Sequence, residues 1–293
     1  MPERGSPNLA RRRRLAAELR RLREQAGLTG DQVTQSLGWP ASSKLSRIEH
    51  GKTGLKQADL EGLLDLYGVT DSYRAELSAL GEESRKAGPP QSGFRLPGQQ
   101  AEFLAAERDA ASVWIWEPQI VPGLFQIEEY SRALLQAWVD MFSLPPGEVE
   151  RRVQARRLRQ EVLRRQPSLE LSAVLDESVL RRRLGDASVM HRQLQHIVMI
   201  SELPGVEVRI LPLDGDHLIG TGAFNYIRFR QIHAVPLHDL VAFEHLTGTG
   251  YVESDDETNQ YRVAFESLLT RTLPPDESRA LIGDLAADWW SPS

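Results

Sequence analysis

Two short amphipathic stretches on either side of Gly38-Trp39-Pro40 constrain the fold of this chain more than any other feature. The first, residues 28–37, opens with Thr29 and Gln32 at the T-x-x-Q spacing of a capping box, which predicts the first turn of a helix. Glycine and proline end that helix, and residues 41–50 predict a second short helix. The chain therefore turns sharply between two helices.

Apolar residues mark the inner side of both helices. Val33 and Leu37 lie four positions apart in the first helix, and Leu45 and Ile48 lie three apart in the second. Residues at these spacings share one helix face, so we expect all four to pack against the leucines of an earlier helix. The opposite face of the second helix is then free to contact a partner.

That outward face is rich in small hydroxyls and cations and poor in acids. It carries Ser42, Ser43, Lys44, Ser46, Arg47 and His50. Small side chains let a helix enter the major groove, where Lys44 and Arg47 can reach guanine or phosphate oxygens. The one acid, Glu49, is expected to pair inward with Arg20 or Arg23. We therefore predict a helix-turn-helix that binds double-stranded DNA.

The expected DNA contacts include both helices and the segment that follows them. They are Thr29, Gln32, Ser42, Ser43, Lys44, Ser46, Arg47, His50 and Lys52. A single short recognition helix reads few base pairs. A homodimer that reads two half-sites is therefore expected, because it would multiply selectivity.

The charge distribution favours a polyanion contact in the first part of the chain. Residues 1–88 carry 15 Lys and Arg against 12 Asp and Glu, a net charge of +3, and the remaining residues have a net charge of −9. No apolar run approaches the roughly 18–20 residues that a membrane span requires. The basic N-terminus lacks the apolar segment of a secretory signal. We expect a cytoplasmic protein without a membrane partner.

Glycine and proline divide the 293 residues into two domains. The stretch AGPPQSGFRLPG at 87–98 is typical of a linker. We predict a DNA-binding domain at 1–88, a linker at 89–98 and a second domain at 99–293. Besides the two helices described above, the first domain is expected to form helices at 8–26, at 56–68 and after Asp71, which makes it an all-α five-helix domain.

The second domain mixes helices and strands. Helices are expected at 99–112, 127–138, 146–165, 186–203, 256–270 and 276–290. Alternating apolar residues predict strands at 168–175, 206–213, 222–230 and 238–246. The glycine-rich segments at 220–224 and 248–253 are interpreted as hairpin turns. This order predicts an α+β domain with a mixed sheet, and hence a multidomain protein.

The pattern L-T-x-x-Q-V-x-x-x-L-G-W, followed by S-K-L-S-R-I-E-H-G, resembles the helix-turn-helix regulators of the xenobiotic-response-element type, which are related to phage repressors. The resemblance implies a lambda-repressor-like five-helix fold and sequence-specific DNA binding. Gly30 departs from the family pattern, since a phosphate-contacting glutamine often stands at that position.

Residues 112–135, SVWIWEPQIVPGLFQIEEYSRALL, resemble the start of a C-terminal domain of unknown function. That domain follows helix-turn-helix domains in actinobacterial regulators such as the WhiJ-like group. Later segments, among them VLDESVLRRRLGD and VEVRILPL, agree with it. The resemblance implies a transcriptional regulator. Several relatives are encoded beside a very small partner protein, an arrangement like that of an antitoxin and its toxin.

The same stretch supplies candidate residues for binding a partner or ligand: Trp114, Trp116, Glu117, Gln126 and Tyr130. Large aromatic residues near the Pro122-Gly123 turn can anchor an interface, or they can simply fill the core. Glu117 could meet a partner's positive charge or pair with Arg132.

No pattern in the chain favours an enzyme. His191 and His196 are five positions apart, as are His233 and His238, and this spacing does not match the i, i+4 pairing of metal ligands. Asp176 and Glu177 follow a strand and are expected to begin a helix, where acids are favoured. We expect no catalytic residue, metal or cofactor.

Three hypotheses remain for the second domain. It could bind a small partner protein and mediate dimerisation, as an antitoxin-like regulator does. Alternatively, it could sense a small molecule and shift the DNA-binding state. An enzyme fused to a DNA-binding domain is a weaker alternative.

Overall fold

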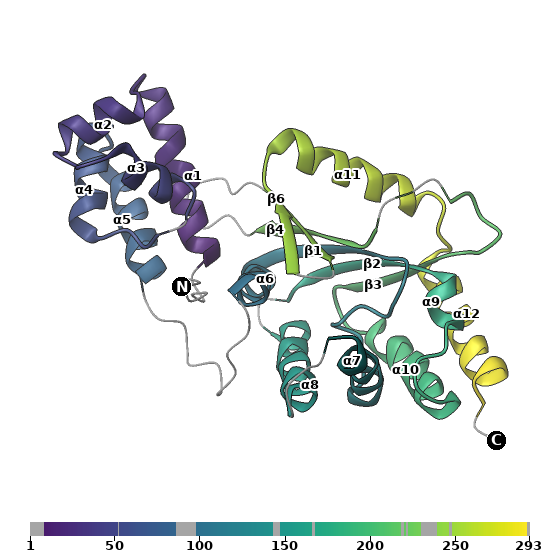
Figure 1. Cartoon of the computed structure of the whole chain (residues 1–293). Coiled ribbons are helices and arrows are strands. Elements are labelled where there is room, and N and C mark those ends of the chain that lie inside the picture. Colours follow the sequence, from purple (N-terminus) through teal and green to yellow (C-terminus); the bar gives the residue numbers. More distant parts are fainter. Residues whose placement is uncertain are drawn as a thin grey trace. The chain divides into compact units, whose positions relative to one another are not determined.

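The computed structural model describes residues 9–51, 53–85, 98–142, 147–165, 168–217, 220, 222–229, 239–245 and 248–291. Among these residues the chain forms two compact units, one that ends at Asp109 and one that begins at Ala110 (Figure 1). The expected linker at 89–98 lies outside the described residues except for Gly98, and so does Lys52.

The first unit consists of helices α1 (Leu9–Gln25), α2 (Gly30–Ser36), α3 (Ser42–Glu49), α4 (Gln57–Leu66), α5 (Asp71–Arg85) and α6 (Gly98–Asp109). The five helices expected in its sequence are confirmed, and α6 packs on α1 in addition. Their shared core contains Leu15, Leu19, Leu22, Val33, Leu45, Ile48, Leu60, Leu63, Leu64 and Leu77. Burial of these leucines and their branched neighbours is the main force that assembles the bundle.

The second unit is built on a six-stranded mixed sheet, which confirms the expected fold class. Its strands are β1 (Ala110–Glu117), β2 (Glu170–Asp176), β3 (Val206–Leu211), β4 (Phe224–Phe229), β5 (Leu240–His245) and β6 (Gly248–Val252). Their order is β3-β2-β1-β4-β5-β6. Strands β1, β2 and β3 run parallel, and β4, β5 and β6 follow in antiparallel pairs. Strand β1 therefore lies where the parallel half meets the antiparallel half.

Helices cover both faces of this sheet. They are α7 (Glu128–Phe142), α8 (Glu148–Arg159) with the 3-10 turn η1 (Gln160–Arg164), α9 (Glu177–Arg181), α10 (Ala187–Ile200), α11 (Asp255–Leu269), α12 (Pro275–Asp284) and the π-turn η2 (Leu285–Trp289). Figure 1 shows α7, α8 and α10 on one face and α11 on the other. The helices that connect the parallel strands thus share a face.

Two segments differ from the sequence-based expectation. The helix expected at 99–112 ends at Asp109, and residues 110–117 form β1, a strand that had not been predicted. The segment at 248–253, expected to be a turn, holds strand β6 at 248–252. Glycine weakens a strand because it has no side chain to pack. Here the Phe243 ring lies over Gly250, its cross-strand partner, and supplies the missing contact.

Among the described residues, no helix is both long and apolar enough to cross a membrane.

Close packing of α5 on α4 generates a stability prediction. Gly81 of α5 is buried, and a Cβ atom there would overlap Cδ2 of the fully buried Leu60 of α4. Gly81→Ala should therefore destabilise the first unit by about 1–3 kcal/mol, the usual cost of overpacking a core. Amide hydrogen exchange of α4 and α5 measures the loss. Gly54→Ala, which places its methyl group in open space, serves as the control. Equal protection in both variants would contradict the packing argument.

Candidate nucleic-acid interface

A tight turn positions α3 across α2. The backbone N–H of Trp39 donates to the carbonyl of Thr34 at 2.8 Å, and Gly38 adopts a left-handed φ of +63°. Leu45 and Ile48 are 2% and 4% exposed, so the expected inward face of α3 is confirmed. Because residues three apart share a face, this burial fixes the rotation of α3 about its axis.

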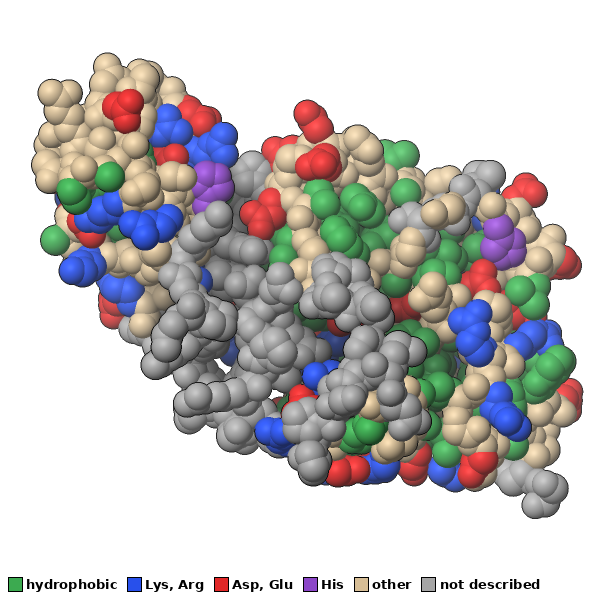
Figure 2. All heavy atoms as spheres, in the orientation of Figure 1, with side chains coloured by type: hydrophobic (Ala, Val, Ile, Leu, Met, Phe, Trp, Pro, Cys, Tyr) green, Lys and Arg blue, Asp and Glu red, His purple; other side chains and the backbone are tan. Residues whose placement is uncertain are grey.

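The opposite face of α3 is open to solvent. Five of its side chains are exposed: Ser42, Ser43, Ser46, Arg47 and His50. The first turn of α3 contains no acid, and the cap residue Ala41 provides no side-chain hydrogen bond to the backbone. The first N–H groups of a helix attract anions when no side chain caps them. Figure 2 shows basic side chains and a histidine on one face of this unit.

Arg47 is oriented by its own helix. Its Nε donates to the carbonyl oxygen of Ser43 at 3.2 Å. Within the described ranges no hydrogen bond or ion pair involves its two terminal nitrogens. A guanidinium held at Nε presents the remaining fork of donors, the arrangement that binds O6 and N7 of guanine.

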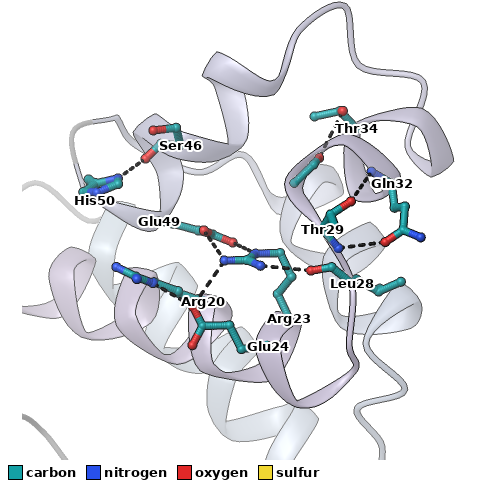
Figure 3. A network of polar contacts seen from close by, with 11 residues as sticks. Arg20, Arg23, Glu24, Leu28, Thr29, Gln32, Thr34, Ser46, Glu49 and His50 are labelled. Atoms are coloured by element: carbon teal, nitrogen blue, oxygen red, sulfur yellow. Dashed lines mark hydrogen bonds and ion pairs between the residues drawn. The ribbon is translucent and has the colours of Figure 1, made fainter.

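His50 is held in a similar way. Its Nδ1 lies 2.6 Å from the carbonyl oxygen of Ser46 (Figure 3). Because a carbonyl can only accept, Nδ1 carries a proton, and Nε2 of the neutral ring is an acceptor. His50 therefore keeps Nε2 available for a hydrogen bond to a partner at the end of α3.

Lys44 differs from the expectation that it projects with Arg47. Its Nζ forms a 2.7 Å ion pair with Asp59 of α4 and lies 3.9 Å from the centre of the Trp39 ring. The side chain is only 34% exposed. Lys44 thus fastens α3 to α4 and to the turn. No local spacing indicates this pair, because Asp59 lies 15 positions away on another helix.

Thr29 and Gln32 form the predicted capping box of α2, which is confirmed. Oγ1 of Thr29 accepts the N–H of Gln32 at 3.3 Å, and Oε1 of Gln32 accepts the N–H of Thr29 at 2.8 Å. Both side chains are exposed, but these oxygens are already engaged in the cap.

Glu49 turns inward, as expected, and its partner is Arg23. Nε and Nη2 of Arg23 donate to the two carboxylate oxygens at 2.7 and 3.1 Å, while Nη1 donates to the carbonyl of Leu28 at 2.9 Å (Figure 3). The hydrogen bond to Glu49 raises the pKa of Arg23. Arg20 pairs instead with Glu24. The only acid of α3 is therefore neutralised away from the exposed face.

The candidate partner-binding residues of the second unit lie on both faces of the sheet. Trp114 stacks on Tyr226 and on Phe265 of α11, with ring centroids 5.2 Å apart in each pair. Trp116 is 3% exposed and belongs to the same cluster. Alternation along β1 places Glu117 on the opposite face. The two tryptophans therefore fill a core on the α11 side.

Glu117, Gln126 and Tyr130 surround the loop after β1. Tyr130 accepts the N–H of Val121 at 3.1 Å, and Gln126 donates to the carbonyl of Val121 at 2.7 Å. Burial raises the pKa of Glu117 to about 7, and the charge of Glu244 contributes to the rise. Arg132, the alternative partner proposed for Glu117, pairs with Glu150 at 2.6 Å.

Asp176 caps α9 by accepting the N–H of Ser178 at 2.9 Å, which confirms its expected role at a helix start. His217 Nε2 lies 3.1 Å from the same carboxylate. Within the described ranges, no three histidine or acidic side chains are grouped so as to hold a metal ion.

Comparison with protein families agrees with the two-part architecture. Residues 14–77 match a helix-turn-helix domain, the class that the packing of α2 and α3 defines. The chain is thus a helix-turn-helix DNA-binding transcription regulator. Residues 100–284 match a domain of unknown function, DUF5753. Because this match covers more than half of the chain, the protein belongs to the DUF5753 family. No curated protein matches it.

The contrast between two acids of this unit generates a prediction. Glu49 and Arg23 are 8% and 15% exposed, whereas Glu24 and its partner Arg20 are both more than half exposed. Glu49→Ala leaves a half-buried guanidinium without its carboxylate, so we expect a loss of about 1–3 kcal/mol in the stability of the first unit. Glu24→Ala removes an exposed carboxylate that pairs with Arg20 at 2.9 Å and meets Arg23 only at 3.4 Å, so it should cost far less. Hydrogen exchange of α1 and α3 distinguishes the two, and equal losses would show that the Arg23 pair does not fasten α3.

Proposed function

We propose that this regulator binds double-stranded DNA sequence-specifically by placing the exposed face of α3 in the major groove. The observation that carries the proposal is the acid-free solvent face of α3, which Leu45 and Ile48 fix from beneath. A helix of eight residues with small side chains fits the width of the groove. The helix-turn-helix match supports this placement.

Roles within α3 follow from the contacts of each side chain. Arg47 is the base reader, since its terminal nitrogens remain available. The hydroxyls of Ser42, Ser43 and Ser46 and the uncapped N-terminus of α3 contact phosphates and base edges. His50 contributes a hydrogen bond to the DNA through Nε2. Lys44 acts as a positioning residue, because Asp59 and Trp39 already hold its charge.

Residues that flank α3 stabilise α2 or contact phosphates. Thr29 and Gln32 stabilise α2, and the amide nitrogen of Gln32 is left to meet a phosphate. Lys52, which lies outside the described residues, is proposed as a further phosphate contact.

We further propose that the regulator acts as a cytoplasmic homodimer of the xenobiotic-response-element type, similar to the WhiJ-like group. One α3 reads too few base pairs to select a site, whereas two half-sites about 34 Å apart would give that selectivity. The second unit is the candidate for dimerisation and for binding a small, antitoxin-associated partner protein.

A second candidate role for this unit is the sensing of a small molecule. The observation that favours it is a pair of partly buried ionisable groups, Glu117 at the end of β1 and Arg156 of α8, whose pKa values burial shifts toward the neutral form. We propose no catalytic activity, because no residue pattern of the chain suggests an enzyme.

Replacement of Arg47 tests the assignment of the base reader. Arg47→Ala should weaken binding to a selected duplex by about 1–3 kcal/mol and relax the preference for guanine at one position. Quantitative binding to duplexes chosen from a random pool measures both effects. Arg262→Ala removes an exposed arginine of the second unit and should leave affinity unchanged. Unaltered affinity in Arg47→Ala would remove this residue from the interface.

The salt dependence of the same binding distinguishes Arg47 from Lys44. Each phosphate contact that is lost lowers the slope of log K against log salt by about 1. If Arg47 reaches a phosphate as well as a base, Arg47→Ala lowers the slope. Lys44→Ala should destabilise the first unit and leave the slope unchanged, because its charge is paired with Asp59. A lower slope for Lys44→Ala would assign that lysine to DNA.

The assembly state is tested by sedimentation and by co-purification. We expect sedimentation to give the mass of two chains for the free protein, or the mass of two chains plus one duplex for its DNA complex. Mass spectrometry of the natively purified regulator should show a small partner protein if the antitoxin-like role is correct. A single-chain mass with and without DNA would contradict the dimer.

A further inference from the structure

Two consecutive tryptophans at the end of η2 have opposite environments. Trp290 is 6% exposed, and its Nε1 donates to the carbonyl oxygen of Leu180 in α9 at 2.8 Å. Trp289, the last residue of η2, is 55% exposed. α9 and η2 are in contact (Figure 1). The buried tryptophan therefore fastens the turn to α9, and its neighbour is held in solvent at a defined position.

Arg181 of α9 orients the exposed ring. Its guanidinium carbon lies 4.7 Å from the centre of the Trp289 ring. Glu177, whose side chain is only 9% exposed, pairs with Arg181 at 2.6 Å. The cation–π contact and the ion pair restrict the rotamers of both side chains. Side chains that are ordered before binding lose less entropy when a partner docks.

Leu213 adds a second exposed apolar side chain to the same surface. Its backbone N–H donates to Oε2 of Glu177 at 3.0 Å, so Glu177 connects it to Arg181. Among the described residues, the large apolar side chains that are exposed are Leu158, Met199, Leu213, Val263 and Trp289. Tryptophan and arginine are the residues most enriched at the energetic centres of protein interfaces. Arg181, Leu213 and Trp289 are called the α9–η2 surface below.

Charges of both signs border the α9–η2 surface. Arg182 and Arg183 follow α9, whereas Asp284 and Asp288 precede Trp289 at the end of α12 and in η2. All four side chains are exposed, and within the described ranges no ion pair involves them. A two-fold axis would place the cations of one copy opposite the acids of another. The surface is thus complementary in charge to itself.

We propose that the α9–η2 surface is the interface of the homodimer, with a second copy of this chain as its occupant. Trp289 lies at the centre, and Arg183 of each copy faces Asp288 of the other. A partner of one predominant charge would be attracted by one of the two charge groups and repelled by the other, so a second copy fits this surface better. The inference rests on the proposed homodimer and assigns a surface to it.

Removal of the exposed ring tests the centre of the interface. Sedimentation equilibrium of the full-length protein over a concentration series measures dimerisation, in whichever state, free or bound to DNA, the wild type is dimeric. Trp289→Ala should weaken the dimer by at least about 30-fold, the loss typical of an interface tryptophan. Val263→Ala removes an equally exposed side chain from α11 and should have no effect. Wild-type dimerisation of Trp289→Ala would overturn the proposal.

A charge swap tests whether the occupant is a second copy. Arg183→Glu and Asp288→Arg each place like charges opposite one another, so each should weaken its own dimer by about tenfold. A mixture of the two variants should form heterodimers with wild-type affinity, because opposite charges then meet at both positions. Native mass spectrometry separates the heterodimer from the two homodimers by mass.

Arg157→Glu serves as the control for the charge swap. Its side chain is 65% exposed on α8, outside the α9–η2 surface, and its replacement should not weaken the dimer. If the mixture of Arg183→Glu and Asp288→Arg dimerised no better than either variant alone, the two-fold arrangement would be wrong.

Failure of this surface is distinguishable from failure of the homodimer. A wild-type protein that is monomeric with and without DNA would refute the homodimer itself. A wild-type dimer that Trp289→Ala leaves intact would refute only the α9–η2 surface. Binding to a single half-site, which α3 alone provides, reports separately on the proposed DNA interface.

Discussion

The attachment of α3 to the helices beneath it is the constraint on which the rest of the DNA-binding unit depends. Leu45 and Ile48 enter the core, and Arg23 of α1 donates two hydrogen bonds to the carboxylate of Glu49. Together they fix the rotation of an eight-residue helix that has little intrinsic stability. The face left in solvent then carries hydroxyls and Arg47 and no unpaired acid.

Local spacing made much of this unit predictable. The capping box of Thr29 and Gln32, the burial of Leu45 and the inward turn of Glu49 all follow from contacts three or four residues apart or from charge on a neighbouring helix. Lys44 was not predictable, because its orientation depends on Asp59 of α4. Spacing along the sequence predicts which residues lie on the same face of a helix. It does not predict which carboxylate of another helix lies within hydrogen-bonding distance.

The second unit was predictable in class but not in detail. Spacing does not predict the strand at 110–117, because its tryptophans also fit aromatics that flank the Pro122-Gly123 turn. Once β1 is in place, alternation separates Trp114 from Glu117, so five candidate residues divide into an aromatic core and a polar neighbourhood.

Site-specific photocrosslinking to DNA tests the central claim most directly. A photoreactive residue placed at Ser46, in the exposed face of α3, should crosslink to bases of a duplex selected by the full-length protein. The same residue at Ser72, exposed on α5, serves as the control and should not. Crosslinks from Ser72 with none from Ser46 would show that α3 does not face the DNA and would contradict the account.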